Sequence, residues 1–563
     1  MEIPKQVRND KLVFSATIDV MLLSVNLTEK SFGPKKLFSS LEFSVDDGEK
    51  IGIVGRNGIG KTTLLNILTG NDKDFTGDII ARRGLVMVAT EQEYHNVGAA
   101  TTLEYIVGGL PDFARTNHII ENFAKIENPT AHQLNQYDEA LQIFMRENYF
   151  NVVSEVREML KSFQLEEQAD MRFSGLSGGQ KRLAEVIKIM RSNAHLALID
   201  EPTNYMDHVA KKQFIEWAKN TPTALLIITH DRDVLHEVNR VIEVKDGSAK
   251  SYKGNYDAYL AQNSTRTTTD MHSYETTRRQ IENLKKQMTY ARSKKAAWGG
   301  TADKKNPFVV MEEHAKREIA ELEKIEKPSF WIDKDSAANL DFKDSTRYEK
   351  YKDRNLRINM KNDNSKSRRV LIRAEDLSIG FATPLFHGKN FELSENDILE
   401  IHGRNGAGKT TLIKAILGDP AVKIFHGSVF LDPHARVGIY RQEVDNSLFN
   451  LNLHDAIEQI YTVQKQDISE TKVRKLANDY LFSESDLAVL VKNLSGGQKA
   501  RLQIIAMLSN DPNLLILDEP TSHLDLPSIE ELETALEKYS GAVLYISHDD
   551  YFRRILRGEV VEI

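Results

Sequence analysis

Short apolar runs recur along the chain, and each ends at a polar or glycine-rich segment. Lys50–Val54 and Ile398–Ile401 each precede a glycine-rich loop, whereas Leu196–Asp200 and Leu514–Asp518 each end in acidic residues. Runs of four to five residues that are apolar at almost every position are typical of strands buried on both faces of a parallel sheet. The pattern predicts an α/β fold.

A second pattern repeats apolar residues every three or four positions within residues 112–149, which predicts amphipathic helices. Pro129 divides this segment into two helices. Their apolar positions are Ile119, Ile120, Phe123, Ile126, Leu134, Tyr137, Leu141 and Phe144. A projecting helical pair of this kind serves either as a contact for a partner or as a cap on its own domain.

The same periodicity appears in the middle of the chain as two heptad-like stripes separated by Gly299-Gly300. The stripes are Tyr274, Ile281, Leu284, Met288 and Ala291, and then Met311, Ala315, Ile319, Leu322 and Ile325. Asn306-Pro307 suits a helix start, and Pro328 follows the second helix. We expect a helical hairpin with Trp298 and Phe308 near its tip, where an aromatic ring either packs locally or stacks on RNA.

Four motifs occur twice in the same order. GRNG(I/A)GKTT begins at Gly55 and Gly403, LSGGQK at Leu176 and Leu494, a strand ending in DEPT at Leu196 and Leu514, and I(T/S)HD at Ile228 and Ile546. In both copies 24 positions separate the motif serine from the DEPT glutamate, and 29 separate that glutamate from the histidine. The chain therefore contains an internal duplication, with the central hairpin as a third element.

One spacing differs between the two copies. Lys61 and Ser177 are 116 positions apart, whereas Lys409 and Ser495 are 86 apart. The roughly 30 extra residues must follow Gln92, so the first repeat carries the helical pair as an insertion. We expect three parts, at residues 1–262, 263–369 and 370–563, with the inserted arm at about 112–149.

Composition excludes several kinds of protein. With 563 residues, the chain is too long for one hydrophobic core. It has no cysteine, which excludes disulfides, thiolate metal sites and a cysteine nucleophile. No run approaches the roughly 18 apolar residues that span a bilayer, and Leu12–Val25, which carries Asp19, suits a strand better than a signal peptide. These features predict a soluble protein of the cytoplasm.

Charge is distributed unevenly along the chain. The net charge is −8, but residues 263–369 hold 25 Lys and Arg against 17 Asp and Glu, so this segment is +8 and the remainder −16. A basic segment between acidic ends is compatible with a polyanionic partner. Charge alone favours the simpler interpretation, a solvated helical linker.

The glycine-rich loops match GxxxxGK(S/T), which binds nucleotide phosphates through converging backbone amides and a helix N-terminus. Lys61 and Lys409 should reach the β- and γ-phosphates, and Thr62 and Thr410 should bind Mg²⁺. The other loop residues assigned to ATP binding are Gly55, Asn57, Gly58, Gly60, Thr63, Gly403, Asn405, Gly406, Gly408 and Thr411.

Each DEPT motif supplies two carboxylates at a strand end. Asp200 and Asp518 would hold Mg²⁺ through water, while Glu201 and Glu519 would orient or deprotonate the attacking water. His230 and His548 follow apolar strands and could hydrogen-bond near the γ-phosphate. Gln92 and Gln442 could join metal and water.

The LSGGQ segments open helices and so offer a second set of anion-binding N-termini. They cannot easily serve the nucleotide of their own repeat, which the phosphate loop already holds. The residues concerned are Ser177, Gly178, Gly179, Gln180, Ser495, Gly496, Gly497 and Gln498.

This motif set resembles the ATP-binding cassette (ABC) superfamily. The resemblance implies a head-to-tail pair of cassettes, in which each ATP lies between the phosphate loop of one and the LSGGQ segment of the other. Site one would combine Lys61, Glu201 and His230 with Ser495 and Gly497, and site two Lys409, Glu519 and His548 with Ser177 and Gly179. Phe32 and Phe381 are candidate adenine-stacking residues, unless they belong to the core.

Two fused cassettes, an arm in the first and a charged helical linker resemble the ABC-F family. The resemblance implies an ATPase with ATP and Mg²⁺ as cofactors, acting as a monomer on the 70S ribosome. It would enter the tRNA exit site and direct its linker toward the peptidyl-transferase centre and the P-site tRNA. Candidate contacts with rRNA and tRNA are Arg278, Arg279, Lys285, Lys286, Arg292, Lys294, Lys295, Trp298, Lys304, Lys305 and Phe308.

The linker segment Glu326–Asp333 is closer to members that protect ribosomes from antibiotics than to housekeeping translation factors, and both roles stay open. The sequences of Asn204–Asp207 and Thr521–Asp525 depart from the usual family pattern at the expected cassette interface. Two other classes of protein share the cassette motifs, an ATPase subunit of a membrane transporter and a DNA-associated ABC ATPase. The basic linker and the lack of cysteine argue against both, so we expect neither membrane nor DNA as a partner.

Overall fold

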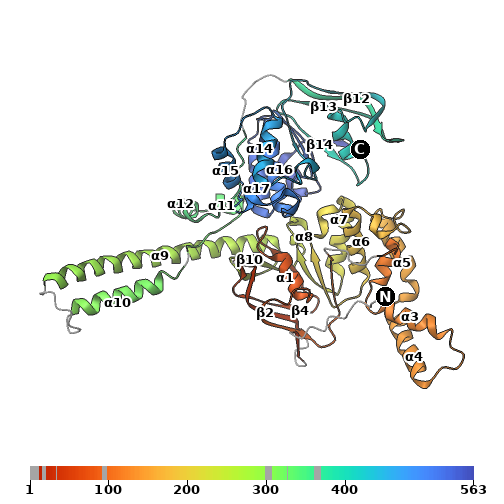
Figure 1. The fold of residues 1–563 in the computed structure, drawn as a ribbon, viewed down its shortest axis with the longest axis horizontal. Helices are drawn as coiled ribbons and strands as arrows, with labels where there is room; N and C mark the ends of the chain where they lie inside the picture. Colours follow the sequence, from red (N-terminus) through yellow and green to blue (C-terminus); the bar gives the residue numbers. More distant parts are fainter. Residues whose placement is uncertain are drawn as a thin grey trace. The chain divides into compact units, whose positions relative to one another are not determined.

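The computed structural model describes residues 12–15, 21–32, 35–91, 98–297, 307–325, 327–360 and 369–563. The chain forms two compact units, one of Met1–Tyr256 with Leu356–Ile563 and one of Asp257–Asn355. We call the first the cassette body and the second the linker unit, and describe each by itself. The predicted fold class, two α/β cassettes and a helical hairpin, is confirmed (Figure 1).

The first cassette contains two sheets. One has the strand order β1-β6-β2-β3, with β4 paired to β2, and the other the order β11-β10-β5-β9-β8-β7. The strands are β1 (Leu12–Ser15), β2 (Met21–Phe32), β3 (Lys35–Phe38), β4 (Leu41–Asp46), β5 (Lys50–Val54), β6 (Thr76–Arg82), β7 (Met87–Ala89), β8 (Leu196–Asp200), β9 (Ala224–Ile228), β10 (Arg240–Lys245) and β11 (Ser248–Lys253). The helices are α1 (Lys61–Leu68), α2 (Thr102–Gly108), α3 (Phe113–Phe123), α4 (Ala131–Arg146), α5 (Val152–Ser162), α6 (Gly178–Arg191), α7 (His208–Asn220) and α8 (Arg232–His236).

Alternating side chains bury both faces of the central parallel strands. In β8, Leu196 and Leu198 pack with α1 and the first sheet, whereas Ala197 and Ile199 pack with α6 and its neighbouring helices. This arrangement is the reason for the continuous apolar runs in the sequence. It also brings the carboxyl ends of β5 and β8 to the start of α1. In open parallel sheets, ligands bind at this carboxyl edge of the strands.

The inserted segment of the first cassette forms the pair α3 and α4, which projects from it (Figure 1). Each helix is short, and the pair is joined by the stacked rings of Phe123 and Tyr137, with centroids 4.1 Å apart. Nearer the cassette, Phe113 stacks on Phe144 at 5.5 Å. The predicted helical arm is thus present, and its apolar stripe serves to hold its two helices together.

The second cassette repeats the design. Its sheets have the orders β13-β12-β15 and β16-β17-β18-β14-β19. The strands are β12 (Val370–Gly380), β13 (Pro384–Ser394), β14 (Ile398–His402), β15 (Lys423–Leu431), β16 (Val437–Tyr440), β17 (Leu514–Asp518), β18 (Ala542–Ile546) and β19 (Glu559–Glu562). The helices are α13 (Lys409–Ile416), α14 (Leu453–Val463), α15 (Glu470–Asp479), α16 (Gly496–Leu508), α17 (Leu526–Glu537) and α18 (Asp550–Leu556).

The linker unit contains the hairpin of α9 (Tyr256–Ala297) and α10 (Pro307–Leu322), followed by α11 (Lys334–Ala338) and α12 (Phe342–Tyr351). The two stripes meet as predicted at Leu284, Ala315 and Ile319, with Ile281, Met288 and Leu322 around them. Two details differ from the expectation. Ile325 is exposed, because α10 ends before it, and Tyr274 packs with a second cluster around Met271 and Phe330.

No helix in the described parts of the chain is both long enough and apolar enough to span a bilayer.

Candidate nucleotide-binding sites

Each phosphate loop connects a buried strand to the start of a helix. In the first cassette the loop leads from β5 to α1, and Gly60 at the helix N-cap has a φ of 104°. Any other residue at this position would also clash sterically, since its Cβ would lie 2.9 Å from the Phe38 ring. The glycine thus allows the backbone amides to turn toward a phosphate.

The lysines of these loops lie inside the fold. The Lys61 ammonium donates to the Gly55 carbonyl and lies 3.1 Å from His230 Nε2. In the second cassette the Lys409 ammonium donates to the Gly403 carbonyl at 2.8 Å. Burial lowers the pKa of both lysines, and neighbouring carboxylates oppose that effect.

A hydroxyl and a carboxylate meet at the start of each helix. Thr62 Oγ1 donates to Asp200 Oδ2 at 3.0 Å, and Thr410 Oγ1 donates to Asp518 Oδ2 at 3.0 Å. Two neighbouring ligands of an octahedral Mg²⁺ at 2.0–2.1 Å lie about 3 Å apart. Both pairs are therefore spaced to hold Mg²⁺, an ion that would neutralise phosphate charge and fix its orientation.

The two glutamates that follow these aspartates adopt left-handed backbone conformations, with φ of 46° at Glu201 and 53° at Glu519. Such a conformation costs energy for a residue with a side chain. Backbone hydrogen bonds maintain it, since the Glu201 amide donates to Ile228 at 2.8 Å and the Glu519 amide to Ile546 at 3.0 Å. The turn directs each carboxylate out of its strand and toward the histidine of the same cassette.

Glutamate and histidine are paired in both cassettes. Glu201 Oε1 lies 3.5 Å from His230 Nε2, and Glu519 Oε1 lies 3.3 Å from His548 Nε2. Burial, together with the preceding aspartate, raises the pKa of each glutamate to about 8. Burial and the nearby lysine lower the pKa of each histidine to about 3, so both imidazoles are neutral near pH 7. A neutral imidazole can donate one hydrogen bond and accept another.

The LSGGQ segments begin α6 and α16, as predicted. Ser177 and Ser495 are the N-caps, and each forms a capping box with the glutamine three residues later, Gln180 or Gln498. In the first site, Ser495, Gly496 and Gly497 of the second cassette line the same cleft as the first phosphate loop. That cleft has a volume of about 780 Å³ and also contains Lys61, Thr62, Asp200, Glu201 and His230.

Further contacts join the cassettes at both phosphate loops. The Asn57 amide donates to Asp525 Oδ2 at 3.0 Å, and the Asn57 side chain donates to the His523 carbonyl at 2.7 Å. In the second cassette, Asn405 makes the matching contacts with Asp207 Oδ2 at 3.2 Å and the Tyr205 carbonyl at 3.0 Å. A Cβ on Gly179 would lie 3.1 Å from the Tyr205 ring, so the first cassette's LSGGQ segment adjoins this second contact.

The remaining predicted residues are placed less centrally. Phe381 and Gln442 are exposed, with 46% of the Phe381 side chain accessible. Gln92 and the side chain of Phe32 lie outside the described residues. The prediction did not assign Leu37, which lines the cleft, or Arg182, which donates to the Asp200 carbonyl. It also did not assign Asp207 and Asp525, although their matched positions in the two repeats were a usable signal.

The predicted RNA-contact residues of the linker fall into two groups. Lys285 pairs with Glu323 at 2.7 Å, and Arg292 and Lys295 pair with Glu312 at 2.8 and 3.4 Å. Of the predicted residues, Arg278, Lys286 and Lys294 are exposed and form no ion pair with an acidic residue in the described part of the chain, and Lys294 lies 5.7 Å from the Tyr290 ring centre. Arg279 is exposed and 3.9 Å from Glu275. Phe308 is half-buried against Tyr290, and Trp298, Lys304 and Lys305 lie outside the described residues.

Comparison with known proteins identifies the repeats. A family model described as ABC transporter matches residues 38–204 and 386–522, and a second model with the same description matches residues 242–342. The chain is 28% identical to the ribosome protection protein VmlR of Bacillus subtilis over 94% of its own length and 84% of that protein. It is 27% identical to ABC transporter F family member 5 of Arabidopsis thaliana, over 95% of this chain and 74% of that protein.

Solved structures agree on the fold. The archaeal ribosome recycling factor aABCE1, in its complex with the stalk protein aP1, superposes with a TM-score of 0.53 at 17% identity, covering 92% of this chain and 84% of that one. The duplicated cassettes bind ATP and hydrolyse it. Because both cassettes and the intervening linker match, the chain belongs to the ABC-F family of tandem ABC ATPases.

Proposed function

We propose that this ATPase binds the 70S ribosome in its ATP-bound form, enters the tRNA exit site and brings its linker hairpin near the peptidyl-transferase centre and the P-site tRNA. In this role it protects the ribosome from antibiotics that bind there. The observation that carries the proposal is the basic surface of α9, where Arg278, Lys286 and Lys294 are exposed and available to phosphates. The name of the relative VmlR as a ribosome protection protein supports the same role.

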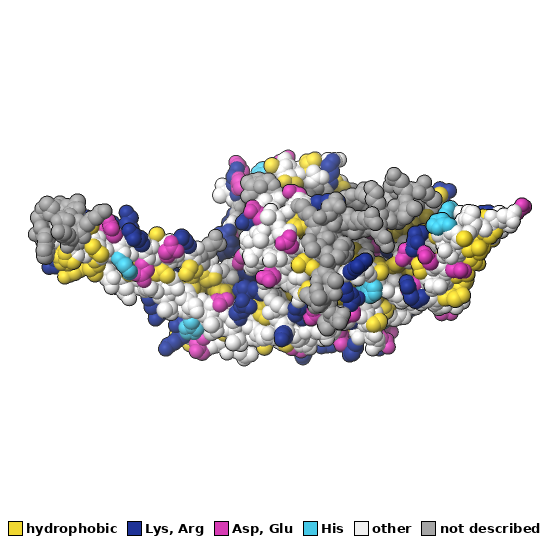
Figure 2. Space-filling view, turned by 90° about the horizontal axis from the view of Figure 1, so that it is seen from below, with side chains coloured by type: hydrophobic (Ala, Val, Ile, Leu, Met, Phe, Trp, Pro, Cys, Tyr) yellow, Lys and Arg dark blue, Asp and Glu magenta, His cyan; other side chains and the backbone are white. Residues whose placement is uncertain are grey.

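The linker surface carries both acidic and basic side chains, so the basic residues available to RNA are those that no acidic neighbour already neutralises. On the face in Figure 2, basic side chains lie among acidic and hydrophobic ones along the linker. The cations that pair with Glu312 and Glu323 hold α9 to α10. Arg278, Lys286 and Lys294, which have no acidic partner among the described residues, could neutralise an RNA backbone, which is the sequence-independent part of nucleic-acid binding.

Two ATP sites between the cassettes would drive this cycle. In site one, Lys61 and Thr62 would bind phosphate and Mg²⁺, and Glu201 and His230 would act on the attacking water beside Ser495 and Gly497. In site two, Lys409, Thr410, Glu519 and His548 would do the same beside Ser177 and Gly179. Closure with ATP and opening after hydrolysis would then control attachment to the ribosome.

Ribosome pelleting tests the proposal. The E201Q/E519Q variant keeps the cleft but lacks both bases, so with ATP it should pellet with 70S ribosomes, whereas without ATP it should stay in the supernatant. Adding R278A/K286A/K294A should weaken pelleting and flatten its salt dependence by about one log–log unit per lysine or arginine removed. The matched variant K285A/R292A/K295A removes equal charge from the paired set and should change pelleting less. Absence of ATP-dependent pelleting would refute ribosome binding.

A translation assay separates the two roles within the family. Wild-type protein should raise the concentration of a peptidyl-transferase inhibitor needed to halve translation in vitro. If it relieves stalled ribosomes without any antibiotic and leaves that concentration unchanged, it is a translation factor of the housekeeping kind.

A further inference from the structure

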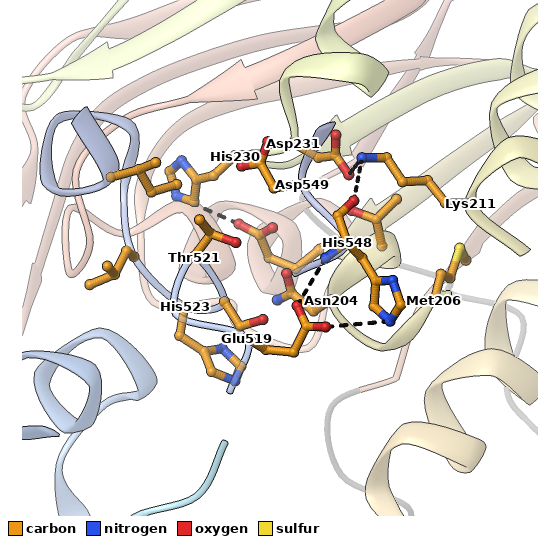
Figure 3. A pocket seen from close by; sticks show the side chains of 15 residues that line it. Asn204, Met206, Lys211, His230, Asp231, Glu519, Thr521, His523, His548 and Asp549 are labelled. Atoms are coloured by element: carbon orange, nitrogen blue, oxygen red, sulfur yellow. Dashed lines mark hydrogen bonds and ion pairs between the residues drawn. The ribbon is translucent and has the colours of Figure 1, made fainter. Parts of the chain in front are cut away.

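A lysine of the first cassette contacts the backbone of a catalytic-site histidine in the second. Lys211 lies on α7, and its ammonium donates to the His548 carbonyl at 3.3 Å. The same ammonium pairs with Asp231 Oδ2 at 2.9 Å and Asp233 Oδ2 at 2.6 Å. Figure 3 shows the Lys211 side chain reaching toward the His548 backbone from the neighbouring cassette.

This contact borders a cavity of about 50 Å³ between the cassettes. Both glutamate–histidine pairs line it, Glu201 with His230 and Glu519 with His548. Lys211 and Ile529 also line it. The two reaction centres therefore border one small internal space.

Lys211 and Ile529 are equivalent positions. Each stands four residues after the aspartate that caps its helix, Asp207 for α7 and Asp525 for α17. An isoleucine has no group that can donate a hydrogen bond to the His230 carbonyl. Lys211 therefore makes a hydrogen bond to the histidine of site two that Ile529 cannot make to the histidine of site one.

Two neighbouring carboxylates stabilise the charged form of Lys211. Its side chain is 7% exposed. Burial lowers the pKa of this lysine, but Asp231 and Asp233 more than reverse the effect, so the group stays protonated. A charged donor makes a stronger hydrogen bond to a carbonyl than a neutral one.

His548 is consequently held at both ends of its backbone. Its amide donates to Glu519 Oε2 at 3.3 Å, and its carbonyl accepts from Lys211. Restraint of both groups fixes where the imidazole projects, which matters because small displacements of a catalytic group reduce rates strongly.

We infer that Lys211 is a positioning residue through which the first cassette orients His548, so that hydrolysis at site two depends on cassette closure more strictly than hydrolysis at site one. The inference rests on the proposed assignment of Glu519 and His548 to site two. It predicts that the two sites hydrolyse ATP unequally because of Lys211, a residue outside the four repeated motifs.

The test measures each site separately. In an E201Q background only site two turns over, and in an E519Q background only site one. K211M keeps the length of the side chain without its charge, and should lower kcat in the E201Q background about 10- to 100-fold with little change in KM. In the E519Q background it should leave kcat within about twofold, and K211R should restore most of the activity of site two.

Three outcomes are decisive. A loss confined to the E201Q background supports the inference, whereas an equal loss in both backgrounds, or none, overturns it. Because K211M leaves Asp231 and Asp233 without their partner, K211M/D233N is measured in parallel if K211M fails to fold. Residual hydrolysis by E201Q/E519Q would instead refute the assignment of the two glutamates, independently of Lys211.

Discussion

The carboxylate of Asp525 connects the two cassettes. Its Oδ1 accepts from the Ser528 amide at 3.1 Å and so caps α17, while its Oδ2 accepts from the Asn57 amide in the opposite phosphate loop at 3.0 Å. Asp207 has the same double role, with the Ala210 amide at 2.9 Å and the Asn405 amide at 3.2 Å. The phosphate loop of each cassette is therefore attached to the start of a helix in the other.

Substitutions of Asp525 should separate its role as a helix cap from its role as a contact for the opposite phosphate loop. D525A removes both hydrogen bonds, and loss of the cap should cost about 1 kcal/mol, or roughly 2–4 °C in Tm. The KM for ATP at site one, measured from hydrolysis in an E519Q background where only site one turns over, should rise as well. D525N retains a capping oxygen, so its Tm should stay near that of the wild type. If D525A left this KM unchanged, the contact with Asn57 would have no role in binding.

A buried ion pair spans the cassettes on one side. Arg232 donates to both carboxylate oxygens of Glu533 at 2.9 and 3.2 Å, and each side chain is 5% exposed. R232M removes the guanidinium that pairs with the buried Glu533 carboxylate and should destabilise the closed protein by about 3–5 kcal/mol.

The double variant R232M/E533M should recover most of that loss, because it removes both charges of the pair. Urea unfolding of the single and double variants measures the coupling. R82A, which breaks the more exposed pair between Arg82 and Asp47, is the control and should cost at most about 1 kcal/mol. Equal destabilisation by R232M and the double variant would contradict the expectation.

Stability of the nucleotide-free protein should depend on its buried histidines. His230 and His548 have pKa values lowered to about 3, against about 6.5 when unfolded. Between these values the unfolded chain binds more protons, so their contribution to stability is present above pH 6.5 and is lost as the pH falls toward 3.

Glu201 and Glu519, whose pKa values are raised to about 8, stabilise the fold as the pH falls and oppose this effect. The prediction is therefore a difference: between pH 7 and pH 5 the Tm of H548Q should fall less, or rise more, than that of the wild type. H314Q changes an exposed linker histidine and is the matched control, expected to follow the wild type. A difference between pH 7 and pH 5 that is the same in H548Q and the wild type would exclude His548 as a source.

The threonine at the start of each cassette helix should set the requirement for Mg²⁺. T62A removes a hydroxyl placed 3.0 Å from Asp200, and should raise the half-saturating Mg²⁺ concentration of site one about tenfold. T410A should act likewise on site two. T69A, at the far end of α1, removes a hydroxyl that bonds only the Asn66 carbonyl in the described structure and should have no such effect. Titration of ATPase activity with Mg²⁺ in E519Q and E201Q backgrounds gives both values.

Local sequence was sufficient for the parts of each site that lie within one repeat. Lys61 and Thr62 follow a buried strand, and Glu201 follows another, so their meeting at one sheet edge depends only on strand order and spacing. The helix starts at Ser177 and Ser495 were equally predictable. In the linker, heptad spacing identified Leu284, Ala315 and Ile319 as partners, because helical periodicity determines which side chains share a face.

Contacts between repeats required the tertiary structure. Asn57 and Asp525 are 468 positions apart, and Lys211 and His548 are 337 apart. No periodicity relates such residues, since their approach depends on how two finished cassettes associate. The sequence showed two nearly identical sets of catalytic motifs. Only the structure revealed that Lys211 and Ile529 line the same cavity and that Lys211 contacts His548, because which residues meet across an interface depends on packing and not on spacing.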